Sequence, residues 1–460
     1  MRKTTCWQKG SITAPMLIMS AAFTLVIYGL VFMLANQWDF TFRQTAYDQA
    51  LSVAEAGIQY YRWHLAHSPN DYQDGTGQPG PYVHTYRDQQ GKEVGTYSLE
   101  IETPTDGSSI ITITSTGWVN DYPQAKRTVT AKYGIPSLAR FSHLTNASAW
   151  YGQGITIHGR IHSNTGIRMD GVNTSLVTNS QATYKCGQDT GCSPTVNKDG
   201  VWGSGPNANL WLYPYPPVDF DAILFDFAVM RDEAVANGVY LPDSHAQGYH
   251  IQFLADGRFS VFKVTRTYSN HGYSINEGCR RWYSRIRNEE LLGTYQVADN
   301  PVIFAEDDVW VDGIVNGRTT VGVASFPLQS LKANIWINDN ITYLAKDGRH
   351  ALGLIAQDDI FFGRDLPDDF EVNAALMAQN GKVMRHGYFD NCGDTPYAVR
   401  NSLTIYGSII SNQKSYWNYG DGPTSGFRTR TVTYDANLLY NAPPYFPTDG
   451  EYEFISWEER

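Results

Sequence analysis

The chain has 460 residues, enough for two or three domains, and a formal net charge of −11. Because phosphate-binding surfaces are basic, that charge argues against a nucleic-acid partner. Charged residues make up only 18%, aromatic residues 13%, and there are 41 glycines. This composition favours a large β-rich structure with many turns and excludes a disordered chain.

The first expected element is a membrane anchor at residues 11–35, a run without any charged residue. As a helix, this run is long enough to cross a hydrocarbon core of about 30 Å. Arg2, Lys3 and Lys9 precede it, so the positive-inside rule places the N-terminus in the cytoplasm and the C-terminal domain outside the inner membrane. A cleaved secretory signal is the alternative, but its apolar region spans only about 7–15 residues.

The helix is expected to continue past the membrane, from residue 12 to about residue 66. Residues 39–67 contain no proline, and Ser68-Pro69-Asn70 then ends the helical pattern. Apolar residues recur at spacings of three and four, which predicts one packing face of the helix: Ala50, Val53, Ala54, Gly57, Ile58, Tyr61 and Leu65.

The N-terminal residues resemble those of type IV pilins, especially minor pilins of the PilX type. The resemblance rests on Lys9-Gly10, the apolar run behind it, and the segment 51-LSVAEAGI-58. It implies that prepilin peptidase cuts after Gly10 and leaves Ser11 as the new N-terminus. It also implies other pilins or pilus assembly proteins as partners. Pro15 stands where major pilins carry a glutamate, which minor pilins of this type often lack as well.

Residues 70–135 are expected to form a small antiparallel sheet. Four stretches alternate between apolar and polar residues and are separated by turn sequences, namely 82–86, 94–102, 110–118 and 125–133. One face of such a sheet can pack on the stripe of the helix. The resemblance implies the same arrangement, because a pilin head is a helix laid on an antiparallel sheet.

Residues 139–460 contain short strand-like segments set off by Asn, Asp and Gly. Asp307–Val311 resembles both Asp358–Phe362 and Asp339–Tyr343, and Leu354–Gln357 recurs 22 residues later as Leu376–Gln379. A period of about 20 residues favours a parallel β-helix, or solenoid. A β-sandwich or jelly roll is the alternative. The expected fold class is therefore α+β and mainly β.

An insertion at about 210–300 is expected to interrupt the solenoid with a helix and a hairpin. Residues 218–236 have a helical pattern with Asp219 as a possible N-cap and Gly238 just past the end. Residues 251–264 predict a hairpin that turns at Asp256-Gly257. The tail at 427–447 resembles the C-terminus of large pilin-like surface proteins.

Four cysteines follow the apolar run, and an even number outside the cytoplasm suits disulfides. Cys186 and Cys192 can close a local loop, which leaves Cys279 and Cys392 as the second pair. Free buried thiols are the alternative. No C-x-x-C spacing occurs, so the cysteines do not predict a zinc site.

Candidate catalytic groups are few. Asp307-Asp308 and Asp358-Asp359 can be read as a glycosidase-like acid/base pair, but their recurrence at equivalent repeat positions favours turns that cap the backbone. His158, His162 and Asp170 are weak candidates for a metal site. The aromatic segment 415–419 can stack on sugars or be buried at an interface. Neither a nucleophile motif nor a phosphate-binding loop is present.

The sequence thus predicts a membrane-anchored minor pilin-like surface protein of a type IV pilus or pseudopilus system. Its role is structural and adhesive, with a surface glycan or a protein as the ligand of the distal domain. It is predicted to be no enzyme, to use no cofactor or metal, and to bind no nucleic acid. A membrane-anchored polysaccharide lyase or hydrolase on a β-helix scaffold is the alternative function.

Overall fold

The structure is a computed structural model that describes residues 12–104, 108–221, 226–328, 331–393, 396–420, 423–448 and 450–459. The expected cleavage position, Gly10-Ser11, and the leader at residues 1–10 lie outside the described residues. The chain divides into two compact units. The first unit comprises Met1–Thr103, Ile111–Gly134 and Tyr452–Arg460, and the second comprises Pro104–Ile110 and Ile135–Glu451.

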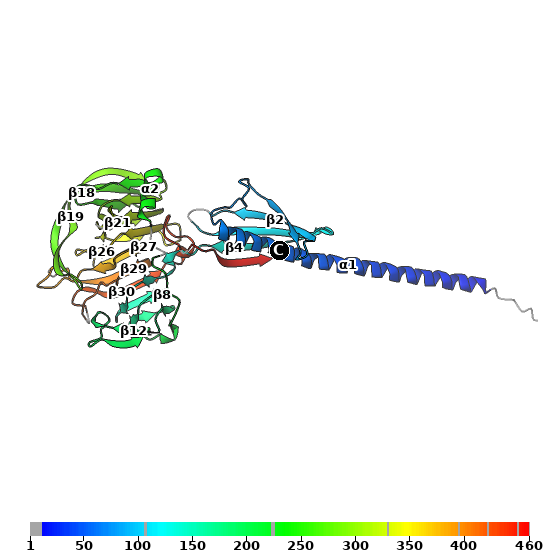
Figure 1. Cartoon of the computed structure of the whole chain (residues 1–460), viewed down its shortest axis with the longest axis horizontal. Helices are drawn as coiled ribbons and strands as arrows, with labels where there is room; N and C mark the ends of the chain where they lie inside the picture. The colour runs from blue at the N-terminus through cyan, green and yellow to red at the C-terminus, as the bar shows by residue number, and fades with distance from the viewer. Residues whose placement is uncertain are drawn as a thin grey trace, which may run out of the picture. The chain divides into compact units, whose positions relative to one another are not determined.

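The first unit is a long helix on an antiparallel sheet. Helix α1 spans Thr13–His67, and its second half lies along the sheet in Figure 1. The described strands of this sheet follow the order β1, β2, β3, β4, β31, with bounds Tyr82–Arg87, Glu93–Glu102, Ile111–Val119, Tyr122–Gly134 and Glu453–Glu459. The predicted helix and small sheet are confirmed.

The last strand of that sheet, β31, comes from the C-terminus, which the sequence assigned to the distal domain. That assignment of residues 452–460 is wrong. β31 pairs antiparallel with β4, so that Phe454 lies opposite Tyr133 and Trp457 opposite Ala131. Strand β4 would otherwise expose a free edge with unpaired backbone groups, and β31 supplies the missing partner.

The second unit is a stack of short parallel strands arranged in three ladders within the described ranges. All these ladder pairings are parallel, so the sandwich and jelly-roll alternatives are wrong, and the β-helix-like architecture is confirmed. The first ladder follows the order β16 (Val239–Leu241), β20 (Val302–Ala305), β22 (Arg318–Val323), β25 (Ala351–Ala356), β27 (Asp369–Ala378), β29 (Val399–Ser411), β5 (His143–Thr145), β8 (Ile161–Ser163), β11 (Val177–Asn179) and β15 (Trp211–Leu212).

The other two ladders complete the coils. The second ladder contains β17 (Tyr249–Phe253), β21 (Val309–Val315), β23 (Ile335–Ile337), β26 (Ile360–Phe362) and β28 (Val383–Arg385). A separate parallel sheet joins β6 (Ala149–Tyr151), β9 (Ile167–Met169) and β14 (Val201–Trp202). The third ladder leads from β21 through β24 (Ile341–Tyr343), β27, β29, β30 (Gly426–Tyr434) and β7 (Ile155–His158) to β10 (Val172–Asn173).

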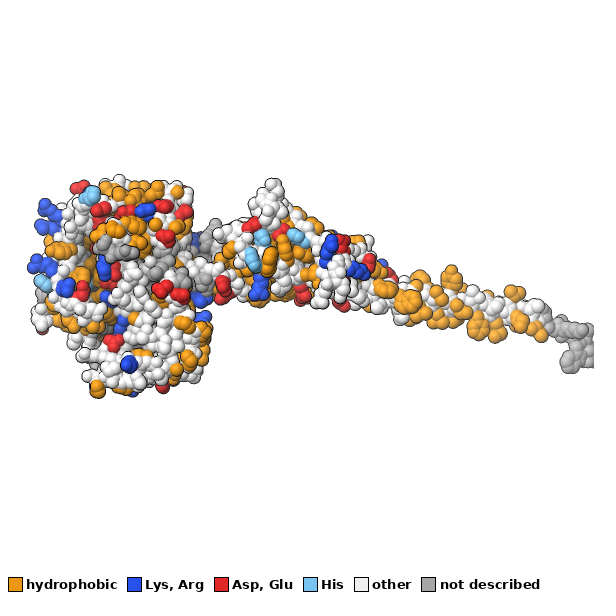
Figure 2. Space-filling model, viewed as in Figure 1, with side chains coloured by type: hydrophobic (Ala, Val, Ile, Leu, Met, Phe, Trp, Pro, Cys, Tyr) orange, Lys and Arg blue, Asp and Glu red, His pale blue; other side chains and the backbone are white. Residues whose placement is uncertain are grey.

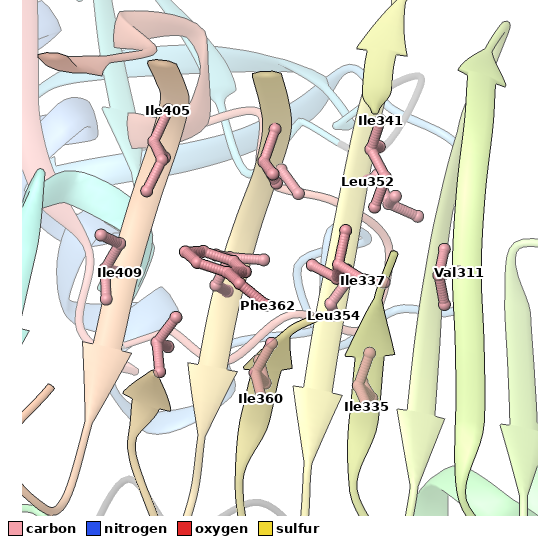
Figure 3. Packing of buried hydrophobic residues seen from close by; sticks show 14 of the residues in the cluster. Val311, Ile335, Ile337, Ile341, Leu352, Leu354, Ile360, Phe362, Ile405 and Ile409 are labelled. Carbon is pink, nitrogen blue, oxygen red and sulfur yellow. The ribbon is translucent and has the colours of Figure 1, made fainter. Parts of the chain in front are cut away.

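Alternate residues of every coil point inward and form one continuous core. Figure 3 shows Ile335, Ile360, Leu354 and Phe362 from neighbouring strands stacked between the ladders. The spacing of 22 residues seen in the sequence is a coil-to-coil step, because Leu354 pairs with Leu376. β-Branched and aromatic residues in such buried parallel strands account for the near-continuous apolar runs.

The chain enters this stack in the middle. Strand β5, the first of the ladder strands in sequence, lies between β8 and β29. From β5 the chain proceeds through β8 and β11 to β15 at one end of the first ladder, and it resumes with β16 at the other end. It then returns coil by coil until β29 reaches β5.

The connection between the two ends contains helix α2, which spans Phe227–Asn237. The predicted start at residue 218 is wrong: the cap is Asp226, whose carboxylate accepts hydrogen bonds from the amides of Ala228 and Val229 at 2.9 and 3.3 Å. Asp219 instead accepts from the amide of Asp221 in a turn. Phe227, Met230 and Ala234 pack on the outside of the first ladder.

The expected insertion at about 210–300 also differs from the structure, because β16 and β17 are themselves coil strands that pair with β20 and β21. What stands apart from the coils is a long hairpin of β18 (Arg258–Ser274) and β19 (Gly278–Gln296), drawn in Figure 1 along one side of the stack. The remaining elements are β12 (Thr183–Cys186), β13 (Val196–Asp199) and the 3-10 turns η1 (Leu138–Arg140), η2 (Gln188–Thr190), η3 (Ala208–Leu210) and η4 (Ala436–Leu439).

Candidate interaction surfaces

The N-terminal half of α1 is an exposed apolar surface. Its best 18-residue window has a mean hydropathy of 2.4, and none of that window is buried. Bulky side chains from Ile12 to Phe42 are more than half exposed, and Figure 2 shows hydrophobic side chains along the visible face of this half of the helix. Among the described residues, this is the one helix that is long and apolar enough to cross a membrane. An exposed surface of this kind needs lipid or another apolar helix to cover it.

The C-terminal half of α1 packs on the antiparallel sheet through its stripe of apolar residues. Every residue of the predicted packing face is buried, and Ala46 extends the buried stripe toward the N-terminus. Glycines permit a very close approach between helix and sheet. A Cβ added to Gly117 of β3 would lie 2.4 Å from the Ala54 nitrogen, and one added to Gly57 would lie 2.3 Å from the Ser115 hydroxyl. The helix is therefore fixed in one register on the sheet.

The second ladder of the solenoid has an apolar outer side, which the long hairpin covers. Trp310, Trp336, Phe361 and Met384 occupy equivalent positions on successive strands and are all buried. The rings of Trp336 and Phe361 stack with centroids 4.4 Å apart. Three aromatic residues and one methionine make up this row, which is called here the aromatic ladder. Outward-facing residues of a coil are normally in water, so these apolar side chains need another segment to shield them from solvent.

The hairpin supplies that cover from its inner face. Val264, Trp282 and Ile286 pack on the aromatic ladder. The backbone carbonyl of Ser284 accepts hydrogen bonds from Trp310 Nε1 at 2.8 Å and from Asn338 Nδ2 at 2.6 Å. The hairpin is thus attached to the coils by apolar contacts and by hydrogen bonds to two coils. Burying each large apolar side chain contributes about 2 kcal/mol to the free energy of folding.

Two further links tie the hairpin to the coils at its base and at its tip. At the base, His250 of β17 is hydrogen-bonded to Glu289 of β19 and to Asp312 of β21, each at 2.9 Å. Burial lowers the pKa of His250, but the hydrogen bonds and charges of Asp312 and Glu289 outweigh that effect and leave it raised. At the tip, Cys279 forms a disulfide with Cys392.

The other disulfide joins Cys186 to Cys192 and closes the small loop behind β12. The aromatic segment 415–419 is also internal in part. Trp417 belongs to the solenoid core, and the Tyr419 hydroxyl donates hydrogen bonds to the carbonyls of Tyr273 and Arg385 at 3.0 and 3.2 Å. These two rings are therefore not available to stack on a sugar.

The aspartate pairs lie at turns before the second ladder. Asp308 accepts a hydrogen bond from the Asn334 amide at 2.8 Å, Asn334 Oδ1 accepts from the Asp359 amide at 3.1 Å, and Asp359 accepts from the Lys382 amide at 2.8 Å. Each side chain thus binds the backbone of the next coil. Asp308 and Asp359 are two coils apart, and Asn334 lies between them. The structure therefore does not bring the two carboxyls together as an acid/base pair.

The predicted equivalence of Asp339–Tyr343 with these repeats is wrong, because β24 belongs to the third ladder, and Asn334 holds the equivalent position. Burial raises the pKa of both Asp308 and Asp359 to about 6. The cause is loss of hydration of the charged form rather than contact between two catalytic carboxyls.

The histidines 158 and 162 and Asp170 are not brought together either. His162 is buried and hydrogen-bonded to Thr178 and Asn164 at 2.8 and 3.0 Å, whereas His158 contacts Thr174 on the third ladder. Asp170 binds Arg168 and the Trp150 indole. No group of His, Cys, Asp or Glu side chains within the described ranges is arranged to hold a metal ion.

Sequence reasoning missed the hairpin strand β19 and with it the aromatic ladder. The signal lay in 280-RRWYSRIR-287, where Trp282, Ser284 and Ile286 alternate with charged or aromatic residues in the period of a strand. The tryptophan and phenylalanine at outward coil positions were a second signal, since three coils repeat the pattern apolar-aromatic-apolar.

No protein-family model matches this sequence, and no curated protein matches it. Among solved structures, the chain is similar to the competence-associated pilin ComZ from Thermus thermophilus, with 17% identity and a TM-score of 0.33 over 90% of this chain and 98% of that one. It is also similar to an ice-binding protein from the Antarctic ascomycete Antarctomyces psychrotrophicus, with 11% identity and a TM-score of 0.25 over 64% and 94% of the two chains. At these TM-scores neither likeness decides a function.

Proposed function

We propose that this chain is a membrane-anchored, pilin-like surface protein whose solenoid is an interaction and adhesion module. The observation that carries the proposal is the division of α1. Its first half is apolar and uncovered, and its second half is buried on an antiparallel sheet. A single uninterrupted helix of 55 residues therefore joins a membrane-soluble segment to a folded head.

In this proposal, the exposed half of α1 inserts in the inner membrane and packs with helices of other pilins during assembly. Side chains such as Phe23, Val26 and Leu30 supply the contact surface. In lipid, such contacts depend on close van der Waals packing, because lipid tails are as apolar as the side chains. The solenoid then lies outside the cytoplasm, where its two disulfides are stable.

The finer assignment is a PilX-type minor pilin, processed between Gly10 and Ser11. It is tested by mass spectrometry of the mature N-terminus in cells with and without prepilin peptidase. We expect a chain that begins at Ser11 only when the peptidase is present, and a Gly10→Val variant that retains Met1. Gly29→Ala, also in the apolar run but with open space at its Cβ, is the matched control and should be processed normally.

A chain that retains Met1 in the presence of the peptidase would contradict the pilin pathway and leave an ordinary anchored ectodomain. Deleting the gene separates the remaining roles. Loss of pili supports a pilus component, and loss of secreted proteins with pili intact supports a pseudopilus component. The proposal assigns no catalysis to the solenoid, since Asp308 and Asp359 hold the backbone of neighbouring coils.

A further inference from the structure

The outer face of the hairpin bears a row of arginine and tyrosine side chains on an otherwise acidic protein. On β19, the exposed side chains are Arg281, Tyr283, Arg285 and Arg287. The residues that alternate with them, Trp282, Ser284 and Ile286, are buried or half-buried on the inner face of the hairpin. On β18, Arg266 and Tyr268 lie beside them, with Tyr268 opposite Arg285. We call these six residues the arginine–tyrosine strip. Figure 2 shows Lys and Arg side chains gathered along this edge of the larger unit.

Most of the positive charge of the strip is uncompensated. Within the described ranges, Arg266, Arg281 and Arg287 form no ion pair, whereas Arg285 contacts Asp365 at 3.2 Å. The guanidinium groups of Arg285 and Arg287 both lie 5.2 Å from the ring centroid of Tyr268. Such cation–π contacts restrict the two side chains and hold their planar faces along the sheet surface. Tyr283, by contrast, leaves 54% of its surface exposed.

The strip is also spaced regularly. Alternate residues of a strand lie about 6.6–6.8 Å apart, so the four positions from Arg281 to Arg287 cover about 20 Å in a line. The inner face of the same hairpin is fixed by the Ser284 carbonyl and by the Cys279–Cys392 bond. A preorganised row of this kind loses less conformational freedom on binding than arginines on a loop do.

These features fit a linear anionic ligand. Guanidinium forks match carboxylate, sulfate and phosphate groups, and an exposed tyrosine ring offers a flat surface to a sugar. Acidic residues flank the strip on the same hairpin, at Glu277 on one side and at Glu290 on the other. Duplex DNA, with one charge per about 1.7 Å, would place many phosphates over these carboxylates. A sugar polymer with a lower charge density avoids that repulsion and has uncharged ring faces for Tyr283.

We infer that the arginine–tyrosine strip binds an acidic polysaccharide. The inference rests on the proposed function of the solenoid as an interaction module, and it names the class of ligand. It does not depend on cleavage at Gly10 or on assembly of α1. A chain purified from cells with prepilin peptidase that retains Met1 but binds the polymer would contradict only the pilin pathway. A chain that begins at Ser11 without strip-dependent binding would contradict only this inference.

The test uses the full chain in a zwitterionic detergent and three immobilised probes: the polyuronate alginate, neutral dextran and single-stranded DNA. We expect binding to alginate that weakens as salt is raised, and none to dextran. The triple variant R266Q/R281Q/R287Q should bind alginate roughly tenfold more weakly or worse, because each exposed charged contact is worth a few-fold in affinity. Y283A should lose affinity several-fold without changing the salt dependence.

The matched control is R87Q/K92Q/R349Q, which removes the same formal charge at exposed positions that do not belong to the strip. It should bind like the wild type. Thermal unfolding of each variant shows that the fold is kept. Equal losses in the control and in the strip variant would overturn the inference, as would binding to dextran or to DNA in preference to alginate. Strip-dependent dimerisation without polymer binding would assign the strip to a second copy of the chain instead.

Discussion

Gly117 of β3 and Ala50 of α1 approach so closely that a Cβ on Gly117 would lie 2.5 Å from the Ala50 carbonyl oxygen. The neighbouring atoms are helix backbone, which cannot turn aside as a flexible side chain can. This contact fixes the distance between the helix and the sheet that it crosses, and it makes the first unit sensitive to the addition of a single methyl group.

Gly117→Ala is therefore expected to destabilise the first unit by about 1–3 kcal/mol, the usual cost of overpacking a close contact. The measurement is thermal unfolding of the full chain in detergent, followed by hydrogen exchange of β3 and of α1 near Ala50. Gly29→Ala is the control, because nothing lies within 4 Å of its added Cβ. Unchanged exchange in Gly117→Ala would mean that the helix is not seated on β3 as described.

Removing the disulfide at the hairpin tip is expected to loosen the cover of the aromatic ladder. The bond links residues 113 positions apart, so C279S/C392S should lose up to about 5 kcal/mol by the chain-entropy argument. Faster hydrogen exchange should be confined to the tip of β18 and β19. The control C186S/C192S opens a loop of only six-residue separation and should leave the hairpin unchanged. Equal exchange in both variants would show that the aromatic ladder alone holds the cover.

The bridge at His250 predicts a pH dependence. Its pKa is raised in the folded state, so the stabilisation is complete below the unfolded pKa of about 6.5 and is lost as pH rises through the folded pKa. Wild-type stability should thus fall as pH increases above about 6.5. His250→Gln should be less stable by about 1–3 kcal/mol at low pH and should show a flatter profile. Denaturant unfolding at a series of pH values gives the comparison, and parallel profiles would refute the assignment.

The burial of Asp308 also predicts that stability falls as pH rises, but here the cause is loss of hydration and not an ion pair. Burial raises its pKa to about 6, so the folded state favours the neutral acid, and the chain loses stability as pH rises from about 4 to about 6. Asp308→Asn keeps an acceptor for the Asn334 amide and should abolish this loss. Asp308→Ala leaves that amide without its partner and should cost about 1–3 kcal/mol. Any hydrolysis of a polysaccharide that Asp308→Asn abolishes would favour the enzyme alternative.

Much of the fold follows from periodicity. The stripe from Ala50 to Leu65 repeats with the helical period, and the four stretches between residues 82 and 134 alternate, so the helix and its sheet were predictable. The step from Leu354 to Leu376 revealed the coils, because stacked residues on successive coils occupy the same environment. These features depend on local sequence alone.

The missed features depend on contacts between distant segments. Nothing near residues 453–459 shows that they complete the sheet of the first unit, since β4 is more than 300 residues away. Strand β19 carries an alternating pattern at Trp282, Ser284 and Ile286, but the aromatic ladder that this face covers lies on strands distant in sequence. The helix start was misplaced because Asp219 and Asp226 are both acceptable caps, and α2 begins after Asp226.

The entry of the chain at the middle of the stack has a consequence for folding. Thr145 and Ser411, whose hydroxyls are 3.3 Å apart, are separated by 266 residues. Because the chain is synthesised from its N-terminus, β5 is made early, but almost the whole domain must follow before β29 can cover its free edge. An unpaired edge is a site of aggregation. Until β29 has been made, β5 therefore keeps an unpaired edge on the side away from β8.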